Sequence, residues 1–305
     1  MKLFGGAALN YFQWNASTET QIFCRMRYLL LIPVFLIGLT FHSCKKSDSA
    51  GKAYQVVRKI TYNGVSVDVV IDKPQNDKVD VLVLYHGTVT FDNKILEAAY
   101  NTLDGFKRIL NRTDMMLVSV AYPEENLLMG DNLPFAEAAL LWVKNNAAQE
   151  LGITVGKVFL AGHSQGGYIV TRLNTMHATQ GVIANAPGPL NLVYRCQLEE
   201  TGQIPASIAC TQLVTTYGAP TANPNPYFLR SLLSFTSPFK SDILFVQGLE
   251  DSPIQMYSWP TFKQAVNACT DCRERQFLEI PGYGHNSLFQ SPFAQTEFNR
   301  FLQAR

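Results

Sequence analysis

One short stretch, residues 156–167, constrains the fold of this chain more than any other. Residues 158–161 form an apolar run of the length typical of a buried strand, and a helical pattern follows from residue 167 to about residue 178. Between them, Gly162-His163-Ser164-Gln165-Gly166 fits the pattern G-x-S-x-G. The two glycines allow neighbouring backbone to pass where a Cβ would clash. A strand, a sharp turn and a helix in this order expose a serine hydroxyl, so Ser164 is the predicted nucleophile.

The chain from residue 54 onward alternates between predicted strands and helices. Two segments with alternating hydrophobicity flank Asn63-Gly64, a strong hairpin signal. The later strands are separated by helical segments, which predicts a mainly parallel central sheet with helices on both faces. The predicted strands are 54–62, 65–72, 79–84, 115–120, 158–161, 182–185, 242–246 and 277–280, and the predicted helices are 94–110, 133–149, 167–178 and 292–303. Ligands bind such sheets beyond the carboxyl ends of the strands, where Ser164, His86 and Asp251 fall.

Two motifs relate this pattern to a known family. Tyr-His-Gly-Thr at 85–88 and Gly-His-Ser-Gln-Gly-Gly at 162–167 resemble the α/β-hydrolases over residues 54–305. The resemblance implies the α/β-hydrolase fold with a cap insertion, and a serine hydrolase that works without a cofactor. The doubled glycine followed by Tyr168 is similar to the catalytic domains of prolyl-oligopeptidase-like enzymes and related esterases.

A serine hydroxyl is a poor nucleophile until a base removes its proton and an acid orients that base. His285 follows the last predicted strand, where the family places its base. The acid is expected after the strand 242–246, and Asp251 is the predicted residue. Glu250 is the close competitor, and Asp242, at the start of that strand, is a weaker one. The order Ser164, Asp251, His285 is the one expected for α/β-hydrolases.

Acyl transfer also needs N–H donors for the tetrahedral oxyanion. The backbone N–H of Gln165 is one expected donor, because it lies at a helix start where the dipole favours negative charge. The second is expected to be the N–H of Thr88, in the loop after His86. His86 either shapes this loop or is an ordinary packed turn histidine.

The amino-terminal residues have a pattern typical of an export signal. Arg25 and Arg27 precede the apolar run 28–41, which is too short for a bilayer span and typical of a signal peptide. A small residue followed by Cys44 resembles a bacterial lipoprotein signal over residues 26–44, which implies a lipid anchor at Cys44 and a membrane-anchored protein facing the periplasm or the cell surface. We expect translation to start at Met26, so that residues 1–25 are an over-extended start, and residues 45–53 to form a tether. An ordinary signal peptide or an uncleaved anchor is the alternative.

Cysteine usage agrees with export. Beyond Cys24 and Cys44, the even number of cysteines favours disulfides, with three possible pairings. The first choice pairs Cys196 with Cys210 and Cys269 with Cys272, and the main rival is a crossed pairing. A four-cysteine zinc site would need paired C-x-x-C knuckles, which the spacing lacks, so no metal is expected.

The segment 187–240 lies between two predicted core strands and is long for a connection without a function. In the family this junction often carries a cap over the active site, so we expect this segment to set substrate choice. Its apolar residues either pack onto the core, which is the default, or line an acyl pocket: Tyr227, Phe228, Leu229, Leu232 and Leu233.

The leading interpretation is a serine hydrolase that cleaves small-molecule or polymer-linked carboxylic esters. A prolyl-oligopeptidase-like peptidase is the first alternative, suggested by Gly166-Gly167-Tyr168. A surface binding protein that kept the fold but lost activity is the second. The net charge of +1, without a long basic run, gives no electrostatic reason to expect nucleic acid as a partner.

Overall fold

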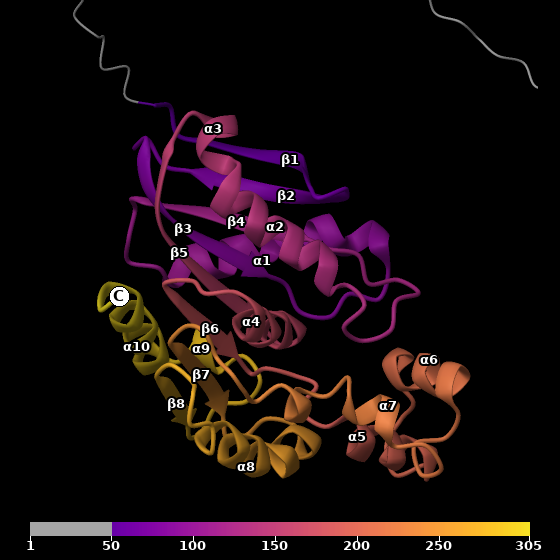
Figure 1. The fold of residues 1–305 in the computed structure, drawn as a ribbon. Coiled ribbons are helices and arrows are strands. Elements are labelled where there is room, and N and C mark those ends of the chain that lie inside the picture. Colours follow the sequence, from indigo (N-terminus) through magenta and orange to yellow (C-terminus); the bar gives the residue numbers. More distant parts are fainter. Residues whose placement is uncertain (1–50) are drawn as a thin grey trace, which may run out of the picture. The chain divides into compact units, whose positions relative to one another are not determined.

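The computed structural model describes residues 51–305, so the predicted signal and the predicted lipidation site Cys44 lie outside the described residues. Eight strands form one sheet in the order β1-β2-β4-β3-β5-β6-β7-β8 (Figure 1). The β1–β2 and β2–β4 pairs are antiparallel, and all other pairs are parallel. The strands are β1 (Tyr54–Tyr62), β2 (Val65–Lys73), β3 (Lys78–Tyr85), β4 (Met115–Ala121), β5 (Thr154–His163), β6 (Gly181–Asn185), β7 (Ile243–Gly248) and β8 (Arg275–Ile280).

The amino-terminal hairpin forms as its turn sequence predicts. Asn63 and Gly64 both have positive φ, at 48° and 81°, as a two-residue hairpin turn that matches strand twist requires. Tyr62 therefore pairs with Val65 across the turn. The predicted β1 has the observed bounds, and every other predicted strand lies within one to four residues of its observed ends.

Helices cover both faces of the sheet, as predicted. One buried cluster joins one face to α2 (Leu133–Asn145), α4 (Gln165–Met176) and α8 (Pro253–Asn267). A second cluster joins the other face to α1 (Ile95–Ile109) and α10 (Pro292–Gln303). Because both faces are covered, every residue of β4, β6 and β7 is buried. Two short helices add buried residues to these clusters, α3 (Ala147–Leu151) and α9 (Ser287–Gln290), and the short turn η1 (Asp92–Lys94) buries none.

The predicted helix 133–149 is two helices. α2 ends at Asn145, and Asn146, with its φ widened to −119°, separates α2 from α3. Consecutive asparagines favour this break because their side chains compete with the helical backbone for hydrogen bonds.

The insert 187–240 folds into α5 (Leu192–Glu200), α6 (Ile208–Tyr217), α7 (Asn225–Phe228) and the turn η2 (Leu232–Ser234). Figure 1 shows α5, α6 and α7 grouped together beyond the sheet. They share a small buried cluster of their own: Leu192, Cys196, Cys210, Leu213 and Tyr227. The predicted packing onto the core is confirmed for Leu232, whereas Tyr227 is buried in the insert's own cluster and Phe228 and Leu229 are exposed.

Residues 51–305 contain two disulfides, Cys196–Cys210 and Cys269–Cys272, which confirm the first-choice pairing. The first joins α5 to α6, so both of its ends lie within the insert. Within residues 51–305, no helix is both long and apolar enough to cross a bilayer.

Candidate active site

Ser164 sits at the turn between β5 and α4 with a strained backbone. Its φ of 57° and ψ of −117° are unusual for a residue with a side chain. Hydrogen bonds hold the turn on both sides, because its N–H donates to Asn185 O at 2.9 Å and its carbonyl accepts from the N–H groups of Tyr168 and Gly188 at 3.1 Å. The surrounding fold thus enforces a conformation that lifts the hydroxyl off the strand.

The glycines of the motif are required by close backbone contacts. A Cβ on Gly162 would lie 2.1 Å from Gly166 O, and a Cβ on Gly166 would lie 1.9 Å from Tyr85 O. Neither distance leaves room for a side chain. The G-x-S-x-G spacing therefore reflects the packing of the turn against the end of β3.

Asp251 and His285 are in contact. His285 Nδ1 lies 2.8 Å from Asp251 Oδ2, and the Asp251 side chain is 4% exposed. Asp251 Oδ1 also accepts the N–H of Ser252 at 2.6 Å. Burial alone would raise the pKa of Asp251, but its hydrogen bonds to His285 and Gln247 outweigh burial and lower the pKa. The carboxylate is thus kept ionised, as an acid that orients a histidine must be.

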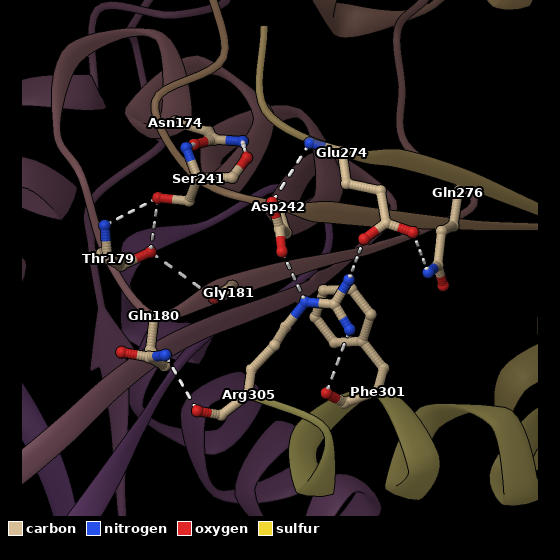
Figure 2. A network of polar contacts seen from close by, with 10 residues as sticks. All are labelled: Asn174, Thr179, Gln180, Gly181, Ser241, Asp242, Glu274, Gln276, Phe301 and Arg305. Carbon is tan, nitrogen blue, oxygen red and sulfur yellow. Dashed lines mark hydrogen bonds and ion pairs between the residues drawn. The ribbon is translucent and has the colours of Figure 1, made fainter.

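The two competing carboxylates lie elsewhere. Glu250 is exposed, and its side chain accepts no hydrogen bond from residues 51–305. Asp242 accepts from Arg305 Nε at 3.0 Å and from the N–H of Glu274 at 3.1 Å (Figure 2). Figure 2 shows the Arg305 guanidinium between Asp242 and Glu274, against the ring of Phe301. Asp242 therefore belongs to a structural network that ties α10 to the sheet.

Ser164 neighbours this pair through His163. The His163 and His285 rings are 4.8 Å apart, and His163 Nδ1 accepts from Asn185 Nδ2 at 2.8 Å. Burial lowers the pKa of His163 to about 4, with the nearby His285 adding to the effect. No hydrogen bond joins the Ser164 hydroxyl to His285 in the described part of the chain, and such bonds are often long before substrate binds.

The two predicted oxyanion residues lie next to each other. The Thr88 hydroxyl donates to Gln165 Oε1 at 2.8 Å. A Cβ on Gly87 would lie 3.4 Å from Ser164 Cβ, so the loop after β3 runs beside the serine. Among residues 51–305, no acceptor takes the backbone N–H of Thr88 or of Gln165, which leaves both N–H groups able to donate to a ligand.

His86 is buried at the base of this loop. Its ring stacks on Tyr122 with centroids 3.9 Å apart, and Nδ1 lies 2.7 Å from Gly87 O. Burial lowers the pKa of His86 to about 4. A neutral, stacked imidazole bonded to the next carbonyl fits the interpretation that His86 shapes the loop.

Glu124, which the sequence did not single out, holds the other end of the loop. Its Oε2 accepts the N–H of Val89 at 2.8 Å, and its Oε1 lies 3.7 Å from His86 Nδ1. Burial raises the pKa of Glu124 to about 8, the Val89 N–H opposes the shift, and the charge of Asp92 adds to it. The only sequence signal was a carboxylate shortly after a buried strand.

A cavity of about 70 Å³ lies between the loop after β3 and the insert. Thr88, Gln165 and Glu124 line one side, and Ile208 and Ala209 of α6 line another. Residues 227–229 and 232–233, for which lining an acyl pocket was the alternative to packing, do not line this cavity. The insert therefore contributes residues of α6 to the lining of this cavity.

Cys269, Asp271 and Cys272 are close enough together to resemble a metal site. Their two sulfurs are joined in a disulfide, so neither is available as a thiolate ligand.

Comparison with solved structures identifies the architecture. Est1E from Butyrivibrio proteoclasticus superposes with a TM-score of 0.57 at 14% identity, over 81% of this chain and 98% of that one. A Pyrobaculum calidifontis esterase superposes with a TM-score of 0.59 at 16% identity, over 82% of this chain and 84% of that one. The chain has the α/β-hydrolase fold.

A Pyrococcus horikoshii acylaminoacyl peptidase also has this α/β-hydrolase architecture. Its TM-score is 0.57 at 13% identity, over 83% of this chain and 41% of that one. No protein-family profile matches the sequence, and no curated protein sequence matches it. At these identities the likeness establishes the fold alone.

Proposed function

We propose that the protein is a serine hydrolase that cleaves carboxylic esters, with Ser164 as nucleophile, His285 as base and Asp251 as the acid that orients it. The observation that carries the proposal is the 2.8 Å hydrogen bond between His285 and the buried Asp251, beside a serine held at positive φ. The esterases among the structural neighbours support it.

In the proposed reaction, Ser164 Oγ attacks the ester carbonyl while His285 Nε2 accepts its proton. Asp251 holds the Nδ1–H, which fixes the tautomer and stabilises the imidazolium. The N–H groups of Gln165 and Thr88 donate to the oxyanion. His285 then protonates the departing alcohol, and a water activated by the same histidine releases the acid from Ser164.

A fluorophosphonate probe and a panel of p-nitrophenyl esters test this function. We expect labelling at Ser164, turnover of esters, and a loss of rate on the order of 10⁶ in Ser164→Ala, as for nucleophile loss in a comparable triad. Ser287→Ala, at a buried serine of α9, is the control. Labelling at another serine would refute the assignment of Ser164, and absence of both labelling and turnover would favour the inactive binding protein.

A peptidase is the second candidate, because one structural neighbour is an acylaminoacyl peptidase. Aminoacyl-p-nitroanilides separate the two activities. Anilide turnover at a kcat/KM equal to or above that of the esters would replace the ester hydrolase with the peptidase.

We also propose export of the protein as a lipoprotein anchored at Cys44, from the signal pattern over residues 26–44. Intact mass of the membrane fraction should show a chain beginning at a lipid-modified Cys44. Cys44→Ser should move the protein out of that fraction. An unmodified chain beginning elsewhere would exclude the proposal.

A further inference from the structure

Two glutamine side chains support the proposed acid. Gln247, the fifth residue of β7, is fully buried. Its Nε2 donates to Asp251 Oδ2 and to Gly248 O, both at 2.9 Å. Its Oε1 accepts from Gln255 Nε2 at 3.0 Å, and Gln255 Nε2 also donates to Pro187 O at 2.9 Å. Two amides therefore connect the acid to the chain just after β6.

The orientation of both amides follows from their backbone partners. A backbone carbonyl accepts and cannot donate, so the atom of Gln247 facing Gly248 O is nitrogen, and so is the atom of Gln255 facing Pro187 O. Each Nε2 has two N–H groups, and all four have acceptors. Gln247 is thereby fixed to present a donor to Asp251.

The donors around Asp251 define the plane of its carboxylate. Oδ2 accepts hydrogen bonds from Gln247 Nε2 at 2.9 Å and from His285 Nδ1 at 2.8 Å, and Oδ1 accepts one from the Ser252 N–H at 2.6 Å. A buried carboxylate is costly unless donors satisfy its oxygens. Because His285 and Gln247 share one oxygen, a shift of Gln247 would change the direction in which Asp251 accepts from His285.

The far end of this chain of amides reaches the nucleophile's backbone. Pro187, which accepts from Gln255, precedes Gly188, and the Gly188 N–H donates to Ser164 O at 3.1 Å. A Cβ on Gly167 would lie 2.8 Å from Pro187 Cα, so this segment packs tightly on the start of α4. The amides thus link the acid loop to the residue that borders the Ser164 turn.

We propose that Gln247 and Gln255 form a positioning relay that fixes the Asp251 carboxylate, and through it the His285 imidazole, relative to Ser164. The inference rests on the proposed function. Neither glutamine contacts the reacting atoms, so both are positioning residues.

A double-mutant cycle tests whether Gln247 acts through Asp251. Gln247→Leu should lower kcat/KM by about 10-fold to 100-fold, the range expected for losing a hydrogen bond to a charged group. In an Asp251→Asn background the same substitution should change kcat/KM by about twofold or less, since coupled residues are not additive. Gln255→Leu should also lower kcat/KM, by a smaller factor, and this loss should likewise shrink in the Asp251→Asn background. Gln276→Leu, at a β8 residue outside the relay, is the control and should leave kcat/KM unchanged.

The pH profile of Gln247→Glu gives a second readout. Burial and the charge of Asp251 both raise the pKa of the introduced carboxyl. While protonated, this carboxyl can still donate to Asp251, so we expect kcat/KM close to that of wild type at the same low pH. Relative to wild type, kcat/KM should then fall as the pH rises through the pKa of the introduced carboxyl. Asp251 and His285 are the titratable groups facing this position, and both are present in wild type and in Gln247→Leu, which should lack the added fall.

The outcomes separate the relay from the proposed function. Suppose that wild-type protein cleaves esters and is labelled at Ser164. If Gln247→Leu then leaves kcat/KM unchanged, or lowers it equally in the wild-type and Asp251→Asn backgrounds, the relay is wrong and the triad stands. If wild-type protein neither cleaves esters nor is labelled, both the relay and the proposed function are wrong. Thermal unfolding of each variant shows whether it folds, and Gln255→Leu and Gln247→Glu decide the question should Gln247→Leu not fold.

Discussion

Thr88 and Gln165 lie 77 positions apart in the sequence and are joined by a 2.8 Å hydrogen bond from Thr88 Oγ1 to Gln165 Oε1. Each is proposed to donate its backbone N–H to the oxyanion. The Gln165 side chain is 4% exposed, so its oxygen has little access to water. The bond therefore fixes the distance between the loop after β3 and the start of α4, where the two N–H groups lie.

Thr88→Val should reduce kcat with little change in KM, because an oxyanion contact exists only in the transition state. Loss of one neutral hydrogen bond of about 1 kcal/mol corresponds to about a fivefold decrease. Thr88→Ser keeps the hydroxyl and should stay near wild type in steady-state ester kinetics. Equal losses in both variants would show that the hydroxyl bond is not what positions the loop.

Asp251→Asn should lower kcat by about 10⁴, because the amide favours the wrong tautomer of His285. The neighbouring Glu250→Gln is the matched control and should have a small effect, since Glu250 is exposed and contacts His285 through no side-chain hydrogen bond of the described residues. Steady-state kinetics on one p-nitrophenyl ester compares the two variants. A larger loss in Glu250→Gln would show that Glu250 is the acid.

Glu124 should make stability depend on pH between about 6.5 and about 8. Its folded pKa is raised from 4.5 to about 8, so folded Glu124 stays protonated where the unfolded side chain is ionised. The contribution of protonated Glu124 to the free energy of unfolding is fully present below the unfolded pKa of 4.5 and is lost as the pH rises through about 8. The pKa values of His86 and His163 are lowered from 6.5 to about 4, so these residues make stability rise with pH below about 6.5. The effect of Glu124 is therefore clearest above about 6.5.

Urea unfolding at several pH values between about 6.5 and about 8 measures this dependence. Wild-type stability should fall as pH rises, and Glu124→Gln, which can still accept the Val89 N–H, should flatten the slope. Glu125→Gln, at the adjacent exposed residue, should leave the slope in place. A wild-type slope that Glu124→Gln does not change would show that Glu124 is not its source.

The sheet and its covering helices could be predicted because long apolar segments dominate their sequences. The runs 115–120 and 243–246, for example, belong to strands buried at every residue. The predicted strands 158–161, 242–246 and 277–280 precede Ser164, Asp251 and His285, and the fold gathers the carboxyl ends of such strands at one edge.

The residues that sequence reasoning missed are polar and buried. Gln247 lies inside an apolar strand, and Glu124 lies in a loop with no periodic pattern, so the sequence gives Gln247 no local signal and Glu124 only its place after a buried strand. Their partners, Gln255 and Val89, are fixed only when β7 meets α8 and when β3 lies beside β4. The helices of the insert were missed as well, because they are short and bury few residues each.

The insert 187–240 is proposed to act as a cap that limits acyl size through α6. Its Ile208 and Ala209 line the cavity of about 70 Å³ that also contacts Thr88 and Gln165. His285 must reach the departing alcohol, so the alcohol lies on the histidine side, and this cavity, which His285 does not line, is left for the acyl group. It is about half the size of a cavity of about 150 Å³ that holds benzene, so a short acyl chain fits.

Ala209→Phe should therefore lower kcat/KM for butyrate esters more than for acetate esters. One or two methylenes in an apolar pocket are worth about 10-fold or more in discrimination, so the butyrate-to-acetate ratio should fall by about that factor. Thr215→Phe, at an exposed residue of the same helix that does not line the cavity, should leave the ratio unchanged. If Ala209→Phe lowers every ester by the same factor, α6 braces the oxyanion loop without selecting the acyl group, and the insert does not set substrate choice through this cavity.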